Sequence, residues 1–169
     1  QQLVQKAIKE YQLPEADFVI ADVGSTIYEI NDSKWDYQRD WEKIIDHDWQ
    51  GKKAFDIHKI LINIDGLQLQ EDSKQNTHKL SYYIALNMDH KQIISTVNNL
   101  LQSHKIKANL IWSIDDQENI GLLDILPASA GKRQAIEFIM QQLKFNYSNT
   151  VFAGDSGNDI CVMSSPIQS

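Results

Sequence analysis

The sequence predicts an α/β fold in which a partial parallel sheet carries an inserted α+β lobe. Apolar runs of strand length lie near both ends, at residues 17–21 and 150–153, and each adjoins a helical pattern. Between them, residues 78–113 change from a period of two to a helical stripe and back, which indicates strand, helix, strand. A chain of 169 residues with 42% hydrophobic content can bury such a core.

The N-terminal part predicts a helix, a loop, a strand and a second helix. A short helix over residues 3–11 precedes the strand at 17–21, which ends in the turn residues Gly24 and Ser25. Residues 57–64 fit a helix or a strand, and 68–76 are a polar loop. The second helix is predicted from apolar residues that share one helical face: Tyr37, Trp41, Ile44, Ile45 and Trp49. Trp41 and Trp49 are expected in the core.

The central part predicts a small sheet covered by a helix. Leu80 and Tyr82 lie on one face of the first strand, with Lys79, Ser81 and Tyr83 on the other. If the helical stripe over residues 93–101 covers the apolar face, the polar face is left open. After a strand at 107–113 come a polar turn, a strand at 122–126 that contains Asp124, and a helix from about Gly131.

Composition excludes several classes of protein. Sixteen Lys and Arg residues against 23 Asp and Glu give a net charge of −7, and no basic run could follow a nucleic-acid backbone. No apolar run approaches the roughly 20 residues of a membrane span, and the N-terminus has no signal-like pattern. Cys161 is the sole cysteine and is expected to pack in a helix. We therefore expect a soluble, cytoplasmic protein that binds neither nucleic acid nor membrane.

The strand predicted at residues 150–153 runs into the segment Gly154-Asp155-Ser156-Gly157-Asn158-Asp159, here called the aspartate loop. This loop is the strongest indication of a functional site in the sequence. Ligands bind at the carboxyl ends of strands in open α/β sheets, and glycines allow a tight turn there. Paired carboxylates at such a loop suit Mg²⁺, which prefers oxygen ligands. The alternative is an Asx turn followed by a helix cap, where Asp and Asn are also favoured.

Lys132 occupies the first turn of a predicted helix. A cation there opposes the helix dipole at a cost of about 0.3–1 kcal/mol, so a nearby anion should compensate. A phosphate oxygen and an aspartate would do so, and lysine is a suitable point charge for a transferring phosphoryl group. A solvated surface lysine is the alternative.

Lys132 followed by the aspartate loop resembles the third and fourth motifs of haloacid dehalogenase-type phosphatases. Three further segments resemble the sucrose-phosphate phosphatase branch: Val23-Gly24-Ser25-Thr26-Ile27-Tyr28, His78-Lys79-Leu80-Ser81-Tyr82-Tyr83 and Leu123-Asp124-Ile125-Leu126-Pro127. The resemblance implies a partial Rossmann-like core over residues 1–29, an α+β cap of the C2 type over 30–122, and the third and fourth core motifs within 123–169.

The resemblance also implies a mechanism and site residues. An aspartate attacks phosphorus, a second aspartate acts as acid and base, and water hydrolyses the aspartyl-phosphate with the help of Mg²⁺. By position, Asp155 would ligate Mg²⁺, Asp159 would support the metal shell, Asn158 would orient the loop, and Lys132 would hold the nucleophile and the phosphate.

The cap and its borders would supply the substrate contacts. Lys79 matches a family lysine and would contact the sugar, although a lysine on a solvated sheet face is the alternative. Asp124 would contact the sugar or brace the cap hinge. Gly24 and Ser25 would adjoin the mouth of the site, and Trp35 could stack on the sugar ring.

The first two motifs of the family are not found in residues 1–169. Asp46-His47-Asp48 has the spacing of the nucleophile motif but lies in an amphipathic helix. Asp22 follows a good strand but has Gly24 where the second aspartate belongs. We therefore expect a fragment without its attacking residue, and no meaningful turnover by these residues alone.

The resemblance implies sucrose 6-phosphate as the preferred substrate. Another glycosyl phosphate, such as mannosylfructose phosphate, is an alternative because the insertion at residues 115–120 departs from the family pattern. A non-catalytic module that binds sugar phosphate or a partner sugar-phosphate synthase is the alternative from another class.

Overall fold

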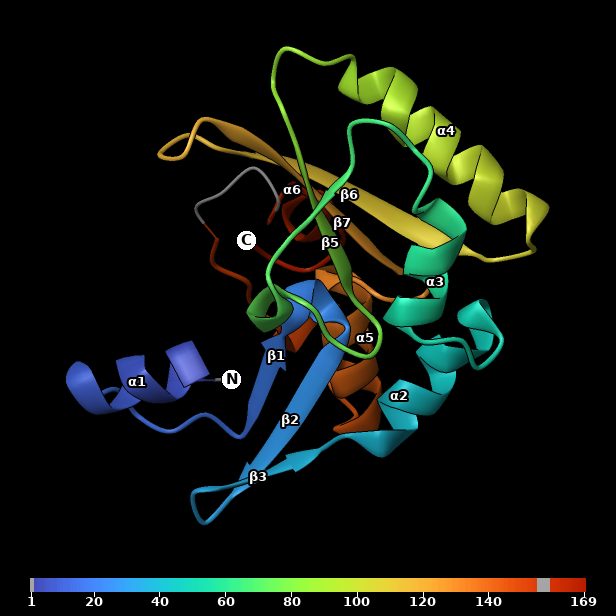
Figure 1. Ribbon diagram of the computed structural model, residues 1–169. Helices are drawn as coiled ribbons and strands as arrows, with labels where there is room; N and C mark the ends of the chain where they lie inside the picture. The colour runs from blue at the N-terminus through green and yellow to red at the C-terminus, as the bar shows by residue number, and fades with distance from the viewer. Residues whose placement is uncertain (1, 155–158) are drawn as a thin grey trace.

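The computed structural model describes residues 2–154 and 159–169 of the chain. Two antiparallel sheets organise the fold (Figure 1). The larger contains β4 (Gln68–Leu69), β5 (Leu80–Ile84), β6 (Ala108–Asp115) and β7 (Ile120–Pro127), in the order β4-β5-β7-β6. A hairpin joins β6 to β7, with Ile111 opposite Asp124 and Ala108 opposite Pro127.

Helices α3 (Ala54–Leu61) and α4 (His90–Ser103) pack against one face of the larger sheet (Figure 1). Tyr82 of β5 and Leu123 of β7 contribute buried side chains to this interface, together with Val97 of α4 and Ile57 of α3. Because side chains alternate along a strand, Ser81 and Asp124 lie on the other face of the same sheet. This lobe matches the predicted small sheet covered by a helix.

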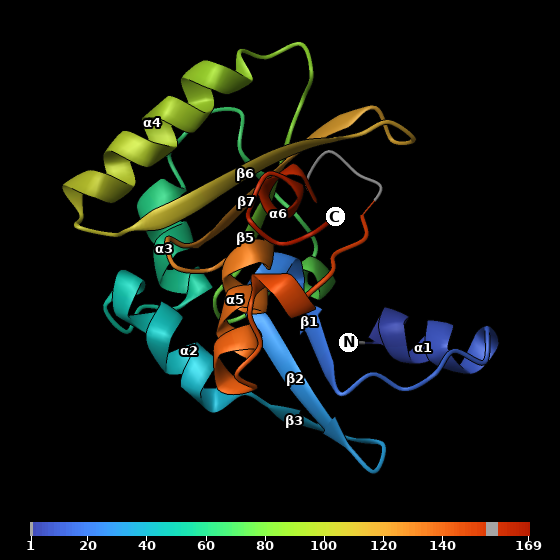
Figure 2. The same ribbon diagram turned by 180° about the vertical axis from the view of Figure 1, so that it is seen from behind.

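The smaller sheet contains β1 (Phe18–Ala21), β2 (Thr26–Asn31) and β3 (Lys34–Tyr37) in sequence order. Helices α2 (Arg39–Asp46) and α5 (Lys132–Gln142) lie beside it, and Figure 2 shows α5 in front of β1 and β2. A buried cluster joins these elements: Ile27, Trp41, Ile45, Leu126, Ala130 and Ala135. The first residue of α5 is thereby held close to the end of β1.

The remaining elements are short. Helix α1 (Gln2–Glu10) lies at the N-terminus, and α6 (Ile160–Met163) follows the aspartate loop. Single turns of 3₁₀ helix are formed by Asp22–Gly24, His47–Trp49, Asp72–Lys74 and Tyr147–Asn149. A parallel bridge pairs Val151 with Gln168.

Several predicted elements differ from the structure. The run at 150–153 forms the single Val151 bridge in place of a strand, and the parallel pairing among the described residues is confined to that bridge. The ambiguous segment 57–64 belongs largely to helix α3. The β2–β3 hairpin was missed, because its turn at Asp32 and Ser33 lacks glycine and both residues adopt positive φ.

Three side chains predicted to face inward lie at the surface. Tyr37 belongs to β3 instead of helix α2, and Ile44 is exposed because the buried face of α2 is formed by Trp41 and Ile45. Cys161 is also exposed, since the short helix α6 turns Val162 into the core instead. The predicted core tryptophans Trp41 and Trp49 are both buried.

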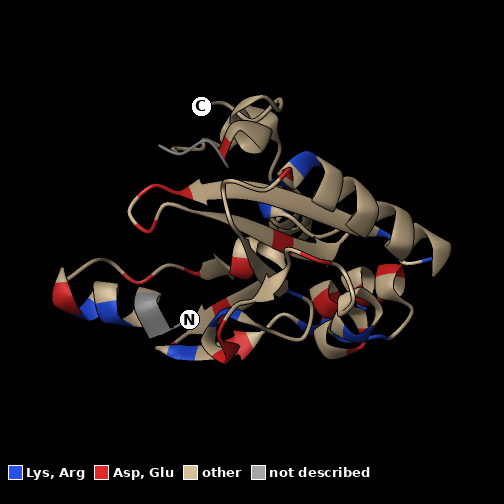
Figure 3. Cartoon of the chain, turned by 45° about the horizontal axis from the view of Figure 1, so that its top comes forward, with Lys and Arg blue, Asp and Glu red and all other residues tan. Residues whose placement is uncertain are grey.

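Charged residues are interspersed over the elements (Figure 3). Among the residues that the structure describes, no helix is both long and apolar enough to span a membrane. The domain boundaries after residues 29 and 122 stay predictions.

Candidate active site

Lys132 and Asp159 come together at the N-terminal end of α5. The Lys132 Nζ atom lies 2.6 Å from Asp159 Oδ1. The lysine side chain is 29% exposed, whereas that of the aspartate is 9% exposed. The carboxylate therefore offsets a cation that would otherwise oppose the α5 dipole. Of the predicted catalytic residues, Asp155 and Asn158 lie outside the described residues.

Asp159 lies close against the backbone of Gly154. A Cβ atom built on Gly154 would lie 2.8 Å from Asp159 Oδ2 and 2.9 Å from its Cβ atom, so only glycine fits there without a shift. This close approach brings the carboxylate to the end of the segment that begins at Val151. The close contact with Asp159 thus explains why residue 154 is a glycine.

Gly24 lies directly against the start of α5. A Cβ atom on Gly24 would clash with the Gly131 carbonyl group and lie 2.6 Å from the Lys132 amide nitrogen. Ser25 is 2% exposed, and its Oγ atom donates to the Asp22 carbonyl oxygen over 3.0 Å. Gly24 therefore adjoins Lys132 through packing, whereas the Ser25 hydroxyl is engaged within its own turn.

Lys79 and Asp124 form a second lysine–aspartate pair, on the larger sheet. Lys79 Nζ lies 3.2 Å from Asp124 Oδ1 and donates to Ser81 Oγ at 2.5 Å and to the Lys74 carbonyl oxygen at 2.6 Å. Ser81 Oγ in turn donates to Asp124 Oδ1. These side chains lie on the predicted face of the sheet, opposite α4.

The predicted openness of that face is wrong for Lys79 and Ser81. Lys79 is 7% exposed and Ser81 is fully buried. The reason is local: the segment 70–76 returns across the strand, with the Gln75 side chain bonded to both backbone groups of Ser81. Sequence alternation identified the face but not this covering segment.

A cavity of about 1450 Å³ lies between the larger sheet and the start of α5. Lys132 and Gln134 line it from α5, and Asn109 and Ser113 line it from β6. Asn109 also donates to the Ala130 carbonyl oxygen over 3.0 Å, which ties β6 to the segment before Lys132. These polar residues were missed because alternating polar positions in a strand carry no sign of what they face.

A smaller polar pocket of about 380 Å³ lies on the other side of the Gly24 turn. Asp22, Ser25 and Asn76 are among its lining residues. Tyr28 also lines it, and burial together with a hydrogen bond to Tyr37 raises the Tyr28 pKa. Trp35 packs edge-on against Tyr28, with ring centroids 5.5 Å apart, so its indole is engaged in the fold.

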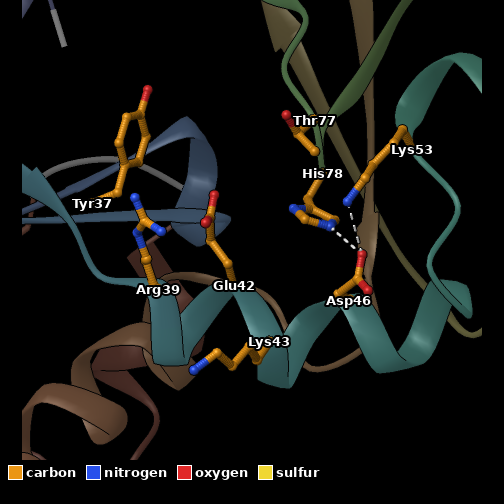
Figure 4. A pocket seen from close by; sticks show the side chains of 8 residues that line it. All are labelled: Tyr37, Arg39, Glu42, Lys43, Asp46, Lys53, Thr77 and His78. Carbon is orange, nitrogen blue, oxygen red and sulfur yellow. Dashed lines mark hydrogen bonds and ion pairs between the residues drawn. The ribbon is translucent and has the colours of Figure 1, made fainter.

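A neighbouring pocket of about 450 Å³ contains an ion-pair network (Figure 4). Asp46 Oδ1 accepts from His78 Nε2 at 2.9 Å and from Lys53 Nζ at 3.1 Å. The hydrogen bond from His78, followed by that from Lys53, lowers the Asp46 pKa. The network explains why the Asp46-His47-Asp48 triplet is structural: Asp48 is likewise engaged, accepting from the Ser129 amide at 2.6 Å.

The donor chemistry of Asp159 fits a magnesium ion, since carboxylate oxygens are the ligands that Mg²⁺ prefers. Within residues 2–154 and 159–169, no group of three or more His, Cys, Asp or Glu side chains surrounds a common metal position. Asp155, the second predicted ligand, lies outside that range.

The family model and the relatives that match this chain agree on one family of proteins. The model of sucrose-6F-phosphate phosphohydrolase matches residues 1–169. A Nitrosococcus oceani protein designated a HAD-like hydrolase is 49% identical over 98% of this chain, which covers 45% of that protein. A sucrose-phosphatase of Nicotiana tabacum is 29% identical over 94% of the chain, which covers 35% of the enzyme. The mannosylfructose-phosphate phosphatase of Agrobacterium fabrum is 26% identical over 90% of the chain, which covers 56% of it.

Solved structures share the fold. The Synechocystis sucrose-phosphatase in complex with sucrose and phosphate superposes with a TM-score of 0.77 at 23% identity, covering 98% of this chain and 62% of that one. A haloacid dehalogenase-like hydrolase of Bacillus subtilis gives a TM-score of 0.62 at 15% identity, covering 96% of this chain and 60% of that one. The chain thus spans less than two thirds of these relatives. It belongs to the sucrose-6F-phosphate phosphohydrolase family and has the capped α/β fold of the haloacid dehalogenase superfamily.

Proposed function

We propose that the chain forms part of a Mg²⁺-dependent phosphatase for a sugar phosphate, with sucrose 6-phosphate as the preferred substrate. The observation that carries the proposal is the 2.6 Å contact between Lys132 and Asp159, beside a large cavity shared by α5 and the larger sheet. The family match over residues 1–169 supports it. Mannosylfructose phosphate is a second candidate, supported by the Agrobacterium relative.

In this proposal, the residues of the chain bind and orient the phosphoryl group. Lys132, partly exposed at the cavity, contributes a positive charge to phosphate oxygens, and Asp159 holds the ammonium group in position. Asp155 and Asp159 would hold Mg²⁺, with Asn158 orienting their loop, and the ion when bound neutralises charge on the phosphate. The attacking aspartate of the aspartyl-phosphate pathway would lie outside these 169 residues, because the family's nucleophile motif is not found in them.

The sugar would lie against the larger sheet. Asn109 and Ser113 of β6 and Gln134 of α5 offer hydrogen-bonding groups to the cavity. Lys79 and Asp124 lie on the same face and stay predicted substrate residues, as do Gly24 and Ser25. A sugar-phosphate synthase as a partner and a cytoplasmic location also stay predictions.

The test uses the full-length gene product and measures phosphate release from sucrose 6-phosphate and mannosylfructose phosphate, with and without Mg²⁺. We expect Mg²⁺-dependent release, lost in Asp155→Ala while circular dichroism stays unchanged. Glu137→Gln on the outer part of α5 is the matched control and should remain active. A folded, full-length protein that binds these compounds and never releases phosphate would support a binding module and overturn the proposal.

A further inference from the structure

The turn between β1 and β2 has an unusual backbone. Asp22, Val23 and Gly24 adopt successive positive φ values of 52°, 60° and 98°. Glycine tolerates this conformation, whereas a β-branched residue such as Val23 is an outlier there. Such residues cost about 1–3 kcal/mol each and persist only where surrounding contacts hold them, which is common at functional sites.

The α2 side of the turn is held by Trp41. Its Nε1 atom donates to the Gly24 carbonyl oxygen over 3.2 Å in a buried environment. The indole ring packs on Phe138 of α5, with centroids 5.2 Å apart. Trp41 therefore connects the Gly24 turn, through a directional bond, to the same helix that carries Lys132.

Asn76, which precedes β5, also contacts the turn. Asn76 Nδ2 donates to Asp22 Oδ2 at 2.7 Å and to Thr26 Oγ1 at 2.8 Å. Its Oδ1 atom accepts from the His78 amide at 2.8 Å. The side chain thus bridges the two ends of the turn and fixes them to the segment that leads into the larger sheet.

The turn packs against the backbone of Gly131 and Lys132 at the start of α5. Gly24 lies so close to the Gly131 carbonyl group and the Lys132 amide that no side chain fits between them. A shift of the turn would therefore move the start of α5. Because Lys132 is the first residue of that helix, the backbone position of its ammonium group depends on the turn.

We infer that the turn of residues 22–25 positions Lys132, and that Trp41 and Asn76 are positioning residues that hold it from two separate segments of the chain. The consequence for phosphate rests on the proposed function, whereas the placement of Lys132 does not. Asn76 gives the segment before β5 a direct mechanical connection to the Lys132 site. Neither Trp41 nor Asn76 is proposed to contact the substrate.

The test compares Trp41→Phe with Ile45→Val in the full-length gene product. Trp41→Phe keeps an aromatic ring beside Phe138 but removes the indole donor, while Ile45→Val loosens the same buried cluster without removing a hydrogen bond to the turn. The first measurement is the ¹³Cε–¹Hε NMR signal of Lys132, assigned from its absence in Lys132→Met. We expect the signal to move in Trp41→Phe and Asn76→Ala and to stay in place in Ile45→Val.

The second measurement is the calorimetric affinity for inorganic phosphate with Mg²⁺ present. We expect about tenfold weaker binding in Trp41→Phe and Asn76→Ala, because small misplacements of a positioned group have large effects. Ile45→Val should change the affinity less than about twofold. An unmoved Lys132 signal in both test variants, or an equal shift in Ile45→Val, would overturn the inference. Absence of phosphate binding in the parent chain would count against the proposed function alone, since the NMR comparison decides the inference independently.

Discussion

The two lysine–aspartate pairs of this protein differ in location and in exposure to solvent. Lys132 and Asp159 meet at a helix terminus beside the large cavity, and the lysine side chain is 29% exposed. Lys79 and Asp124 meet within the sheet, with side chains 9% and 17% exposed, and Ser81 and the Lys74 carbonyl complete their hydrogen bonds. The first pair is therefore the more exposed of the two and borders the cavity, whereas the second is largely enclosed within the sheet.

The comparison predicts that Asp124→Ala has the largest effect on stability. The substitution leaves the buried Lys79 ammonium group without its anion, and breaking a buried ion pair from one side costs about 3–5 kcal/mol. Because Asp124 is partly accessible, we expect the low end, about 3 kcal/mol of the free energy of unfolding. Urea denaturation followed by circular dichroism measures it.

The control is the double variant Lys79→Met/Asp124→Leu, which removes both charges and fills the space with apolar groups. Well-packed apolar replacements of buried ion pairs are often neutral, so we expect the double variant to recover most of the loss. A double variant as unstable as the sum of its single variants would show that the two residues stabilise the sheet independently.

Lys132→Met should have a smaller effect on stability and a larger one on ligand binding. Removal of Lys132 also removes a cation that opposes the α5 dipole, and the adjacent cavity allows water to reach the carboxylate. We expect a loss of about 1–2 kcal/mol in the free energy of unfolding, together with loss of calorimetric phosphate binding. Phosphate affinity equal to that of the parent chain would remove Lys132 from the site.

The difference between the pairs also marks what sequence reasoning could predict. Lys132 stands out because a cation in a first helical turn departs from local preference, and Asp159 stands out as one of two carboxylates in a glycine-containing loop. The strand and helix periods likewise identified the sheet face that carries Lys79 and Ser81. Their roles in binding or catalysis stay predictions.

Nonlocal contacts explain what the sequence could not predict. The covering segment that buries Lys79 is fixed by the Gln75 side chain, and the bond from Trp41 to Gly24 joins residues 17 positions apart. Neither contact leaves a periodic trace in the sequence. The β2–β3 hairpin was missed for a related reason, because its turn places Asp32 and Ser33 in a conformation that usually signals glycine.

A third carboxylate, Asp46, also takes part in ion pairs. Of the substitutions compared, we expect its replacement to have the smallest effect on stability. Its side chain is 34% exposed, and the hydrogen bond from His78, with a further one from Lys53, lowers the Asp46 pKa below its usual value of 3.8. A lowered folded-state pKa means that the stabilisation is present above the unfolded-state pKa and is lost as pH falls through the folded value. In Asp46→Asn, the stability difference from the parent chain should therefore be constant near neutral pH and shrink below about pH 4, as thermal melts across pH 2–7 would measure. A difference that stayed constant down to pH 2 would show that the carboxylate charge contributes nothing. In that case the His78 contact would act only through the geometry that an amide also provides.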